Sequence, residues 1–134
     1  MYILDTNIIS AVRRPDRAPK METWLRGKRE QDLFLSVITL GEIERSIRQQ
    51  ETRDPGFAHD LRTWLDRTVS LFSDRLLSFE AEDARIWGHL SAKVGHTGAD
   101  LMIAATGLRH GAVVVTGNVS DFAPTGVSIE NSFD

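Results

Sequence analysis

Short apolar runs alternate with longer segments of helical periodicity along this chain. The clearest run is residues 112–116, which is unbroken and rich in β-branched side chains. We expect strands there and in the other apolar runs, residues 2–4, 33–37, 76–79 and 127–129. Strands that are joined through helices pair in parallel, and a parallel sheet is covered by helices on both faces. The sequence therefore predicts an α/β fold with a short parallel central sheet between two layers of helices.

Capping and turn residues mark the ends of the expected helices. Asp5-Thr6-Asn7 offers side-chain caps to the first helix, and Gly111 follows the last one. Asp54-Pro55-Gly56 is the strongest internal turn signal. The expected helices are residues 8–12, 18–27, 40–47, 57–72, 81–94 and 99–109. No repeat or flexible linker interrupts the pattern, so we expect a single domain over residues 1–134.

The composition is typical of a globular protein, with 41% hydrophobic and 26% charged residues. Cysteine is absent, which excludes disulfides, thiolate nucleophiles and cysteine-ligated zinc, and fits a reducing compartment. The first residues do not resemble a signal peptide, and no apolar stretch approaches the roughly 18 residues of a membrane span. We therefore expect a cytoplasmic protein without a membrane partner.

The net charge of −3 offers little general attraction to nucleic acids, whose phosphates are contacted by lysine and arginine. Basic residues are nevertheless concentrated in the first part of the chain. They are Arg13, Arg14, Arg17, Lys20, Arg26, Lys28 and Arg29, followed by Arg45, Arg48 and Arg53. Two interpretations stay open: a solvated helix surface, or a basic rim beside an acidic pocket.

Polar and acidic residues follow the expected strands. Asp5 follows the first strand, residues 39–42 follow the second, and residues 116–121 follow the run at 112–116. Asp100 joins them if the turn before it lies at the same edge. Ligands of open α/β sheets bind beyond the carboxyl ends of the strands. We therefore expect one edge of the sheet to gather Asp5, Glu42, Asp100 and Asp121.

Such a cluster has a chemical use. Carboxylates at close range repel one another, and a hard divalent cation such as Mg²⁺ or Mn²⁺, which prefers oxygen ligands, compensates their charge. A metal held in this way polarises a phosphoryl oxygen and activates water, which suits phosphodiester hydrolysis. We expect Thr6 and Thr116 to hydrogen-bond carboxylates, water or phosphate, and Asn118 to orient Asp121 or the nucleophilic water.

Each acidic residue also has a purely structural interpretation. Asp5 is placed to cap a helix, and Asp100 to interact favourably with a helix dipole. Glu42 is then a solvated helix residue, and Asp121 belongs to an ordinary Asx turn. The expected placement of all of them at one sheet edge is what favours a functional site.

Other common sites lack their sequence patterns. His59, His89, His96 and His110 do not show the spacing of a zinc site. The chain contains no G-x-S-x-G elbow, no phosphate-binding P-loop and no G-x-G-x-x-G loop. The tryptophans lie at core spacing within expected helices, so we interpret them as packing residues; they are Trp24, Trp64 and Trp87.

Four short motifs, each with one or more acidic residues, follow one another along the chain. They are YILDTN at residues 2–7, SVITLGEI at 36–43, ADLMIAAT at 99–106 and VTGNVSDF at 115–122. In this order, and over essentially the whole chain, they resemble the motifs of PIN-domain ribonucleases. The resemblance is to the VapC-like toxins of bacterial type II toxin–antitoxin pairs.

This resemblance implies a PIN-like three-layer α/β/α sandwich and an Mg²⁺- or Mn²⁺-dependent endoribonuclease that cleaves RNA through a metal-activated water. Asp5, Glu42, Asp100 and Asp121 match the acidic, metal-binding positions of the family, and Thr116 and Asn118 match its polar positions. The resemblance also implies a homodimer and a small cognate antitoxin. The antitoxin inserts a peptide into the active-site groove and supplies the contact with DNA.

The chain departs from the family pattern in two places. The family commonly has an arginine where this chain has Gly117, and loss of that cation predicts weaker contact with RNA phosphates or a missing partner for a carboxylate. The segment 96–99 is also shorter and less proline-rich than the family segment before Asp100, which predicts a shifted entry of Asp100 into the site.

Two other functions compete with an RNA endonuclease toxin. The first is a catalytically weak PIN-like binding module that acts with an antitoxin in a DNA-binding regulatory complex. The second is a different Mg²⁺-dependent phosphohydrolase, but an aspartyl nucleophile usually needs a second aspartate two positions later, where this chain has Asn7.

Overall fold

The computed structural model describes residues 1–133 and contains a five-stranded sheet in the order β3-β2-β1-β4-β5. Every neighbouring pair of strands is parallel. The strands are β1 (Tyr2–Leu4), β2 (Leu33–Ser36), β3 (Leu76–Leu77), β4 (Val113–Val115) and β5 (Ser128–Glu130). The predicted α/β fold with a short parallel central sheet is thus confirmed. The predicted single domain over residues 1–134 stays a prediction, and residue 134 lies outside the described residues.

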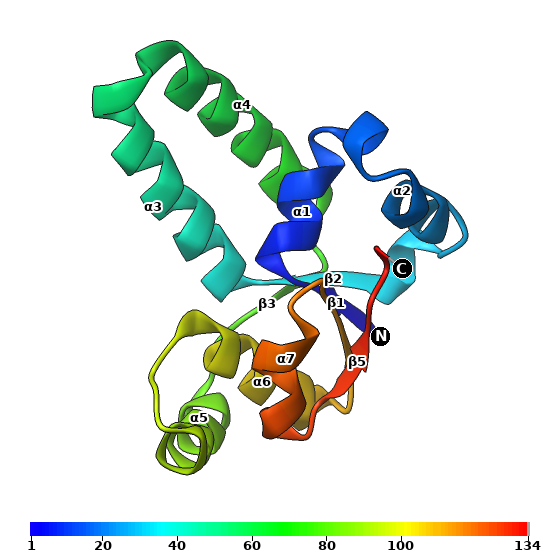
Figure 1. Cartoon of the computed structure of the whole chain (residues 1–134), viewed down its shortest axis with the longest axis vertical. Coiled ribbons are helices and arrows are strands. Elements are labelled where there is room, and N and C mark those ends of the chain that lie inside the picture. The colour runs from blue at the N-terminus through cyan, green and yellow to red at the C-terminus, as the bar shows by residue number, and fades with distance from the viewer. Residues whose placement is uncertain (134) are drawn as a thin grey trace.

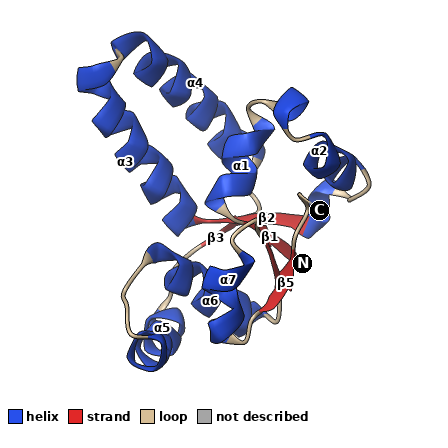
Figure 2. Cartoon of the chain, in the orientation of Figure 1, coloured by secondary structure: helices blue, strands red, loops and turns tan. Residues whose placement is uncertain are grey.

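Helices cover both faces of this sheet, as Figures 1 and 2 show. They are α1 (Thr6–Val12), α2 (Pro19–Arg26), α3 (Val37–Arg53), α4 (Pro55–Leu71), α5 (Ala81–Val94), α6 (Ala99–His110) and α7 (Val119–Phe122). Short 3₁₀ turns span Pro15–Arg17, Glu30–Asp32 and Ala123–Thr125. Helices α1 to α4 lie on one side and α5 to α7 on the other, so the predicted three layers are present. No helix of residues 1–133 is both long and apolar enough to cross a membrane.

The two central strands are buried on both faces and separate two hydrophobic cores. Along β1, Ile3 packs into the core beneath α5 to α7, and Leu4 into the core beneath α1 to α4. Val114 and Val115 of β4 divide in the same way. Successive side chains of a strand point to opposite faces, so an unbroken apolar run serves both cores at once.

Helices α3 and α4 form a hairpin that extends away from the sheet (Figure 1). Asp54 alone separates them, and its carboxylate accepts a hydrogen bond from the Phe57 amide at 3.1 Å, which caps α4. The expected three-residue turn at 54–56 is therefore wrong in extent, because Pro55 and Gly56 already belong to α4. Proline is favoured at a first helical position, where its missing N–H leaves no bond unmade.

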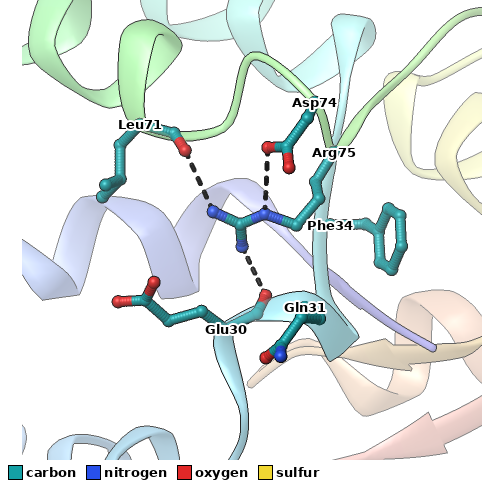
Figure 3. Close-up of a pocket in the computed structure, with 6 residues that line it drawn as sticks. All are labelled: Glu30, Gln31, Phe34, Leu71, Asp74 and Arg75. Atoms are coloured by element: carbon teal, nitrogen blue, oxygen red, sulfur yellow. Dashed lines mark hydrogen bonds and ion pairs between the residues drawn. The ribbon is translucent and has the colours of Figure 1, made fainter.

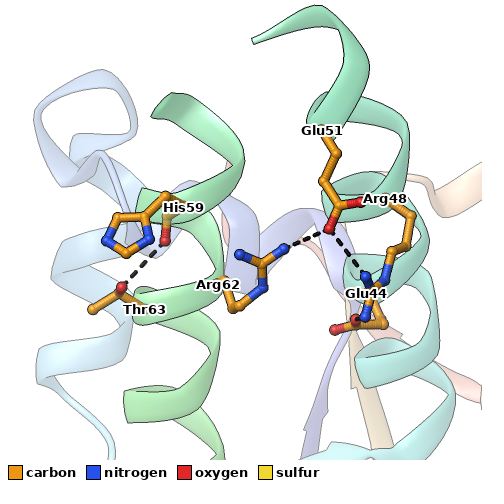
Figure 4. A network of polar contacts seen from close by, with 6 residues as sticks. All are labelled: Glu44, Arg48, Glu51, His59, Arg62 and Thr63. Carbon is orange, nitrogen blue, oxygen red and sulfur yellow. Dashed lines mark hydrogen bonds and ion pairs between the residues drawn. The ribbon is translucent and has the colours of Figure 1, made fainter. Parts of the chain in front are cut away.

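One ion pair joins the two helices of this hairpin, and two more lie within α3 (Figure 4). Glu51 of α3 accepts from Arg62 of α4 at 2.6 Å and from Arg48 at 3.0 Å. Arg48 also lies 3.2 Å from Glu44, one helical turn earlier. Each of these exposed pairs contributes little to stability, and the Glu51–Arg62 pair is the one that joins α3 to α4.

A buried ion pair joins α5 to α6. The fully buried carboxylate of Asp83 accepts hydrogen bonds from Arg109 and from the Thr106 hydroxyl, the latter at 3.2 Å. It also accepts from the Glu80 amide at 3.0 Å and so completes a capping box at the start of α5. Burial opposes the charge of Asp83, yet its bonds with Arg109 and Glu80 outweigh burial and lower its pKa.

Candidate active site

The strand order places a topological switch point between β1 and β4, and we call the region beyond the carboxyl ends of these two strands the crevice. From β1 the chain builds the sheet outward through β2 and β3 on one side, and β4 and β5 then extend it on the other side. At such a switch point the connections leave the two central strands in opposite directions, which opens a space beyond their carboxyl ends. Asp5 follows β1 and Thr116 follows β4, so both lie at this opening.

Asp5 is held by two hydrogen bonds and is almost fully buried, with 2% of its surface exposed. One carboxylate oxygen accepts from the Thr6 amide at 2.8 Å, and the other accepts from the Thr116 hydroxyl at 2.8 Å. The structural interpretation of Asp5 as the N-cap of α1 is therefore correct. The bond to Thr116 goes further, because it ties Asp5 to a strand that lies 111 positions away in the sequence.

The charge of Asp5 is costly at this position. Burial raises its pKa to about 6, although the hydrogen bonds from Thr116 and Thr6 act in the opposite direction. The negative charges of Asp100 and Glu42 also contribute to this raised value. Asp5 therefore lies within range of two other acidic groups and close to none that would neutralise it.

Glu42 reaches the crevice from the second turn of α3. Its carboxylate accepts a hydrogen bond from the Thr6 hydroxyl at 2.5 Å, and the Thr6 hydroxyl lies 3.3 Å from that of Thr39. Helix α3 begins at Val37, earlier than expected, because the Ser36 side chain accepts from the Ile38 amide at 3.0 Å and caps it. This early start places Glu42 over the end of β1.

Asp100 and Asp121 complete the acidic group from the other side of the sheet. Asp100 lies half-buried in the first turn of α6, and Asp121 is exposed on α7. Burial raises the pKa of Asp100, as do the charges of Asp121 and Glu42, while His96 partly offsets them. The structure thus brings the predicted acidic residues within range of one another's charges.

Thr116 and Asn118 lie together at the start of the β4–α7 connection. The Thr116 hydroxyl donates to Asp5 and accepts from the Asn118 backbone amide at 2.9 Å. The Asn118 side chain is exposed and makes no capping bond to α7. Thr116 therefore positions Asp5, whereas the side chain of Asn118 is free to face a ligand.

Asn7 is a residue of this crevice that the sequence-based list of site residues omits. Its amide nitrogen lies 3.5 Å from the Thr116 hydroxyl, and its amide oxygen is buried without a hydrogen-bond partner among residues 1–133. An unpaired buried acceptor is costly and indicates a missing donor, such as water or a ligand. The only available signal was its place two residues after Asp5, which also fits a simple helix cap.

The donor atoms of the crevice are those that Mg²⁺ and Mn²⁺ prefer. They are carboxylate, hydroxyl and amide oxygens, and the unpaired oxygen of Asn7 adds one more. Among residues 1–133, however, no group of three or more acidic or histidine side chains is close enough to hold a metal as the side chains stand. The carboxylates therefore interact through their charges and not through a finished ligand shell.

A pocket of about 640 Å³ at the opposite end of β2 has a structural explanation (Figure 3). Arg75 lines it and donates to the backbone carbonyls of Glu30, Leu33 and Leu71, at 2.5, 3.0 and 2.9 Å. It also lies 3.3 Å from Asp74. With its donors used in this way, Arg75 joins α4 to the start of β2, and the pocket lies away from the carboxylates.

Comparison with known proteins agrees with this architecture. The chain matches the PIN domain family over residues 2–123. It is 30% identical to the VapC ribonuclease Y4jK of Sinorhizobium fredii, covering 100% of this chain and 99% of that one. It is 28% identical to the toxin FitB of Neisseria gonorrhoeae, covering 98% and 97%.

The fold also matches a solved structure over its whole length. The structure of FitAB bound to a DNA fragment superposes with a TM-score of 0.86 at 27% identity, covering 100% of this chain and 96% of that chain. The family match spans most of the chain, and a full-length relative reaches 30% identity. The chain therefore belongs to the PIN-domain family and is a VapC-like member of it.

Proposed function

We propose that this chain is an Mg²⁺- or Mn²⁺-dependent endoribonuclease and the toxin of a type II toxin–antitoxin pair. The observation that carries this proposal is the buried carboxylate of Asp5 at the switch point of the sheet, facing Glu42 and Asp100. Relatives that match along the whole chain are named as a VapC ribonuclease and a toxin, which supports the same function.

In this proposal Asp5, Glu42, Asp100 and Asp121 hold the metal. The ion, when bound, supplies positive charge that stabilises these carboxylates, polarises a phosphoryl oxygen and lowers the pKa of water. Thr116 holds Asp5 in position through its hydroxyl, and Thr6 does the same for Glu42. Asn118 and the amide oxygen of Asn7 orient the attacking water or the RNA phosphate.

The proposed partners follow from the relatives. FitAB was solved bound to DNA, and its matching chain covers this one completely. We propose that this chain likewise pairs with a small antitoxin, which brings the contact with DNA, and that it forms a homodimer. Its net charge of −3 is consistent with an indirect role in DNA binding.

The test is cleavage of structured RNAs by the purified, antitoxin-free chain in Mg²⁺, in Mn²⁺ and in EDTA. We expect cleavage in either metal, none in EDTA, and a loss of at least about 100-fold in Asp5→Asn. Asp66→Asn is the matched control, because it removes an exposed carboxylate on α4 and should cleave like the wild type. Equal cleavage by Asp5→Asn and the wild type would contradict the proposal.

A second candidate function, a catalytically weak binding module, has one observation in its favour. A side chain at Gly117 would bring its Cβ within 2.8 Å of the Phe133 ring, so an arginine at this position does not fit unless Phe133 moves. The chain thus carries no cation at position 117. Failure to cleave any RNA in either metal, with antitoxin and DNA binding intact, would favour this function.

A further inference from the structure

A pocket of about 440 Å³ lies at the end of α1, the helix that Figure 1 shows beside α4 and α2. Its walls come from the end of α1, the following 3₁₀ turn, the start of α4 and the C-terminal segment. Its principal side chains are Arg13, Arg14, Arg17, Phe57 and Phe133, and we call it the arginine–phenylalanine pocket.

The charge of this pocket is largely uncompensated. Among residues 1–133, none of its arginines forms an ion pair, whereas arginines elsewhere pair with Glu22, Asp32, Glu51 and Asp83. Burial and the neighbouring Arg14 lower the pKa of Arg13, and Asp60 offsets only part of this. A bound anion would therefore relieve repulsion that is already present.

The aromatic walls add a second kind of contact. The guanidinium of Arg13 lies 4.9 Å from the centre of the Phe57 ring, which fixes one wall. Phe133 is partly exposed and forms another wall. Proteins that bind single-stranded nucleic acids commonly combine aromatic rings with arginines. The rings stack on the bases, and the arginines contact the phosphates.

The pocket adjoins the acidic crevice through Phe133. The ring of Phe133 lies against Gly117, and a Cβ on Gly117 would be 3.5 Å from the Asn7 amide nitrogen. Gly117 directly follows Thr116, the partner of Asp5. Ser10 of the pocket is five residues after Asp5, or about 8 Å along a helix, which a nucleotide next to the scissile phosphate can span.

We propose that the arginine–phenylalanine pocket binds a nucleotide of single-stranded RNA that flanks the cleaved phosphodiester. The arginines contact its backbone phosphates, and Phe133 stacks on its base. This proposal rests on the proposed ribonuclease function and assigns the subsite that supplies the positive charge missing at Gly117. The same charge complementarity distinguishes RNA from an apolar partner.

The test measures binding of a short, fluorescein-labelled single-stranded RNA by anisotropy, in an Asp5→Asn background so that the RNA stays intact. Arg14→Gln/Arg17→Gln should weaken binding about tenfold or more at 0.1 M salt and reduce the salt slope by about 1.4. Arg67→Gln/Arg85→Gln removes the same charge from exposed positions on α4 and α5 and should change affinity less than about twofold.

Phe133→Leu tests the stacking contact. It should weaken binding at least about fivefold and leave the salt slope unchanged. Circular dichroism of each variant checks that it is folded. If the double arginine variant is unfolded, Arg17→Gln alone replaces it. The slope of log K against log salt should then fall by about 0.7.

The outcomes separate this proposal from the proposed function. If the wild type cleaves RNA but the pocket and control variants bind it equally, the pocket proposal is overturned and the ribonuclease stands. If the pocket variants bind RNA like the wild type and lose only binding to the cognate antitoxin, the pocket serves a protein partner and the proposal is likewise overturned. If the chain neither binds nor cleaves RNA, both proposals fail.

Discussion

At the scale of single residues, Asp5 shows how one side chain serves structure and chemistry together. Its bond with the Thr6 amide caps α1, and its bond with the Thr116 hydroxyl joins β1 to β4 beyond the ends of the strands. Each bond favours the charged form, while burial opposes it strongly enough to raise the pKa to about 6. The Asp5 carboxylate is therefore held in place by its hydrogen bonds, although no basic side chain among residues 1–133 forms an ion pair with it.

The raised pKa of Asp5 predicts an unusual pH dependence of stability. In metal-free protein the folded state keeps the Asp5 proton up to about pH 6, while the unfolded state loses it near 3.8. The free energy of unfolding should therefore fall as pH rises from about 4 to 6, by about 2 kcal/mol from this group. Urea denaturation in EDTA at several pH values between 4 and 6 measures this change in the free energy of unfolding.

Asp5→Asn is the comparison for this measurement, because asparagine keeps the shape and loses the titration. The difference in stability between wild type and variant should grow in favour of the variant between pH 4 and 6. A difference that stays constant over this range would show that Asp5 titrates near its ordinary value.

Asp100→Asn tests the repulsion within the acidic group. Because Asp121 and Glu42 raise the pKa of Asp100, removal of its charge should increase the free energy of unfolding at pH 7 by about 0.5 kcal/mol in EDTA. Mn²⁺ affinity, measured by titration calorimetry, should fall at the same time. Marked unfolding of this variant would identify Asp100 as a structural carboxylate instead.

At the scale of elements, apolar runs predicted the strands well because β1 and β4 are buried on both faces and need no polar alternation. Helix starts were harder. The early start of α3 depends on the Ser36 cap, and the short α7 shows no apolar periodicity that could reveal it. The apolar run at residues 76–79 suggested a strand of four residues, but β3 is only two residues long. It is an edge strand and pairs only with β2 among the described strands.

The α5–α6 contact predicts a second, opposite pH effect. Asp83→Asn should lower the free energy of unfolding by about 2–3 kcal/mol, because the buried side chain at position 83 then no longer carries the charge that pairs with the partly exposed Arg109. The pKa of Asp83 is lower in the folded protein than its ordinary value of 3.8. The stabilisation is therefore fully present at pH values above 3.8, and it is lost as pH falls through the pKa of Asp83 in the folded state.

Thermal unfolding followed at pH 7 and at pH 3 checks this prediction. Glu82→Gln is the matched control, because Glu82 is exposed in the same first turn of α5. Equal melting temperatures of Asp83→Asn and Glu82→Gln at pH 7 would mean that the Asp83–Arg109 pair contributes nothing to stability.

At the scale of the whole molecule, the parallel sheet explains why the site could be anticipated from sequence. Any residue just past a strand end must lie at one edge, which was enough to single out Asp5 and Thr116. The rule says nothing about side-chain geometry. It therefore did not find Asn7, nor show that among residues 1–133 no three of the acidic or histidine side chains stand close enough to hold a metal.

The homodimer is a prediction at this scale. Leu71 is 61% exposed near the end of α4, and a pocket with the side chains of Leu40, Leu65 and Val69 lies on the same α3–α4 hairpin. Apolar surface of this kind favours a partner. Sedimentation should show a dimer at micromolar concentration, and a monomer there would contradict it.

The bond between Asp5 and Thr116 also bears on synthesis of the protein. The first residue of the site leaves the ribosome early, but its partner follows a central strand that is made only after residue 112. Until then β1 lacks its neighbour β4, and one carboxylate oxygen of Asp5 lacks the hydroxyl that holds it. We therefore expect a polypeptide halted at any earlier codon, which lacks Thr116 and Asp121, to be without the proposed nuclease activity.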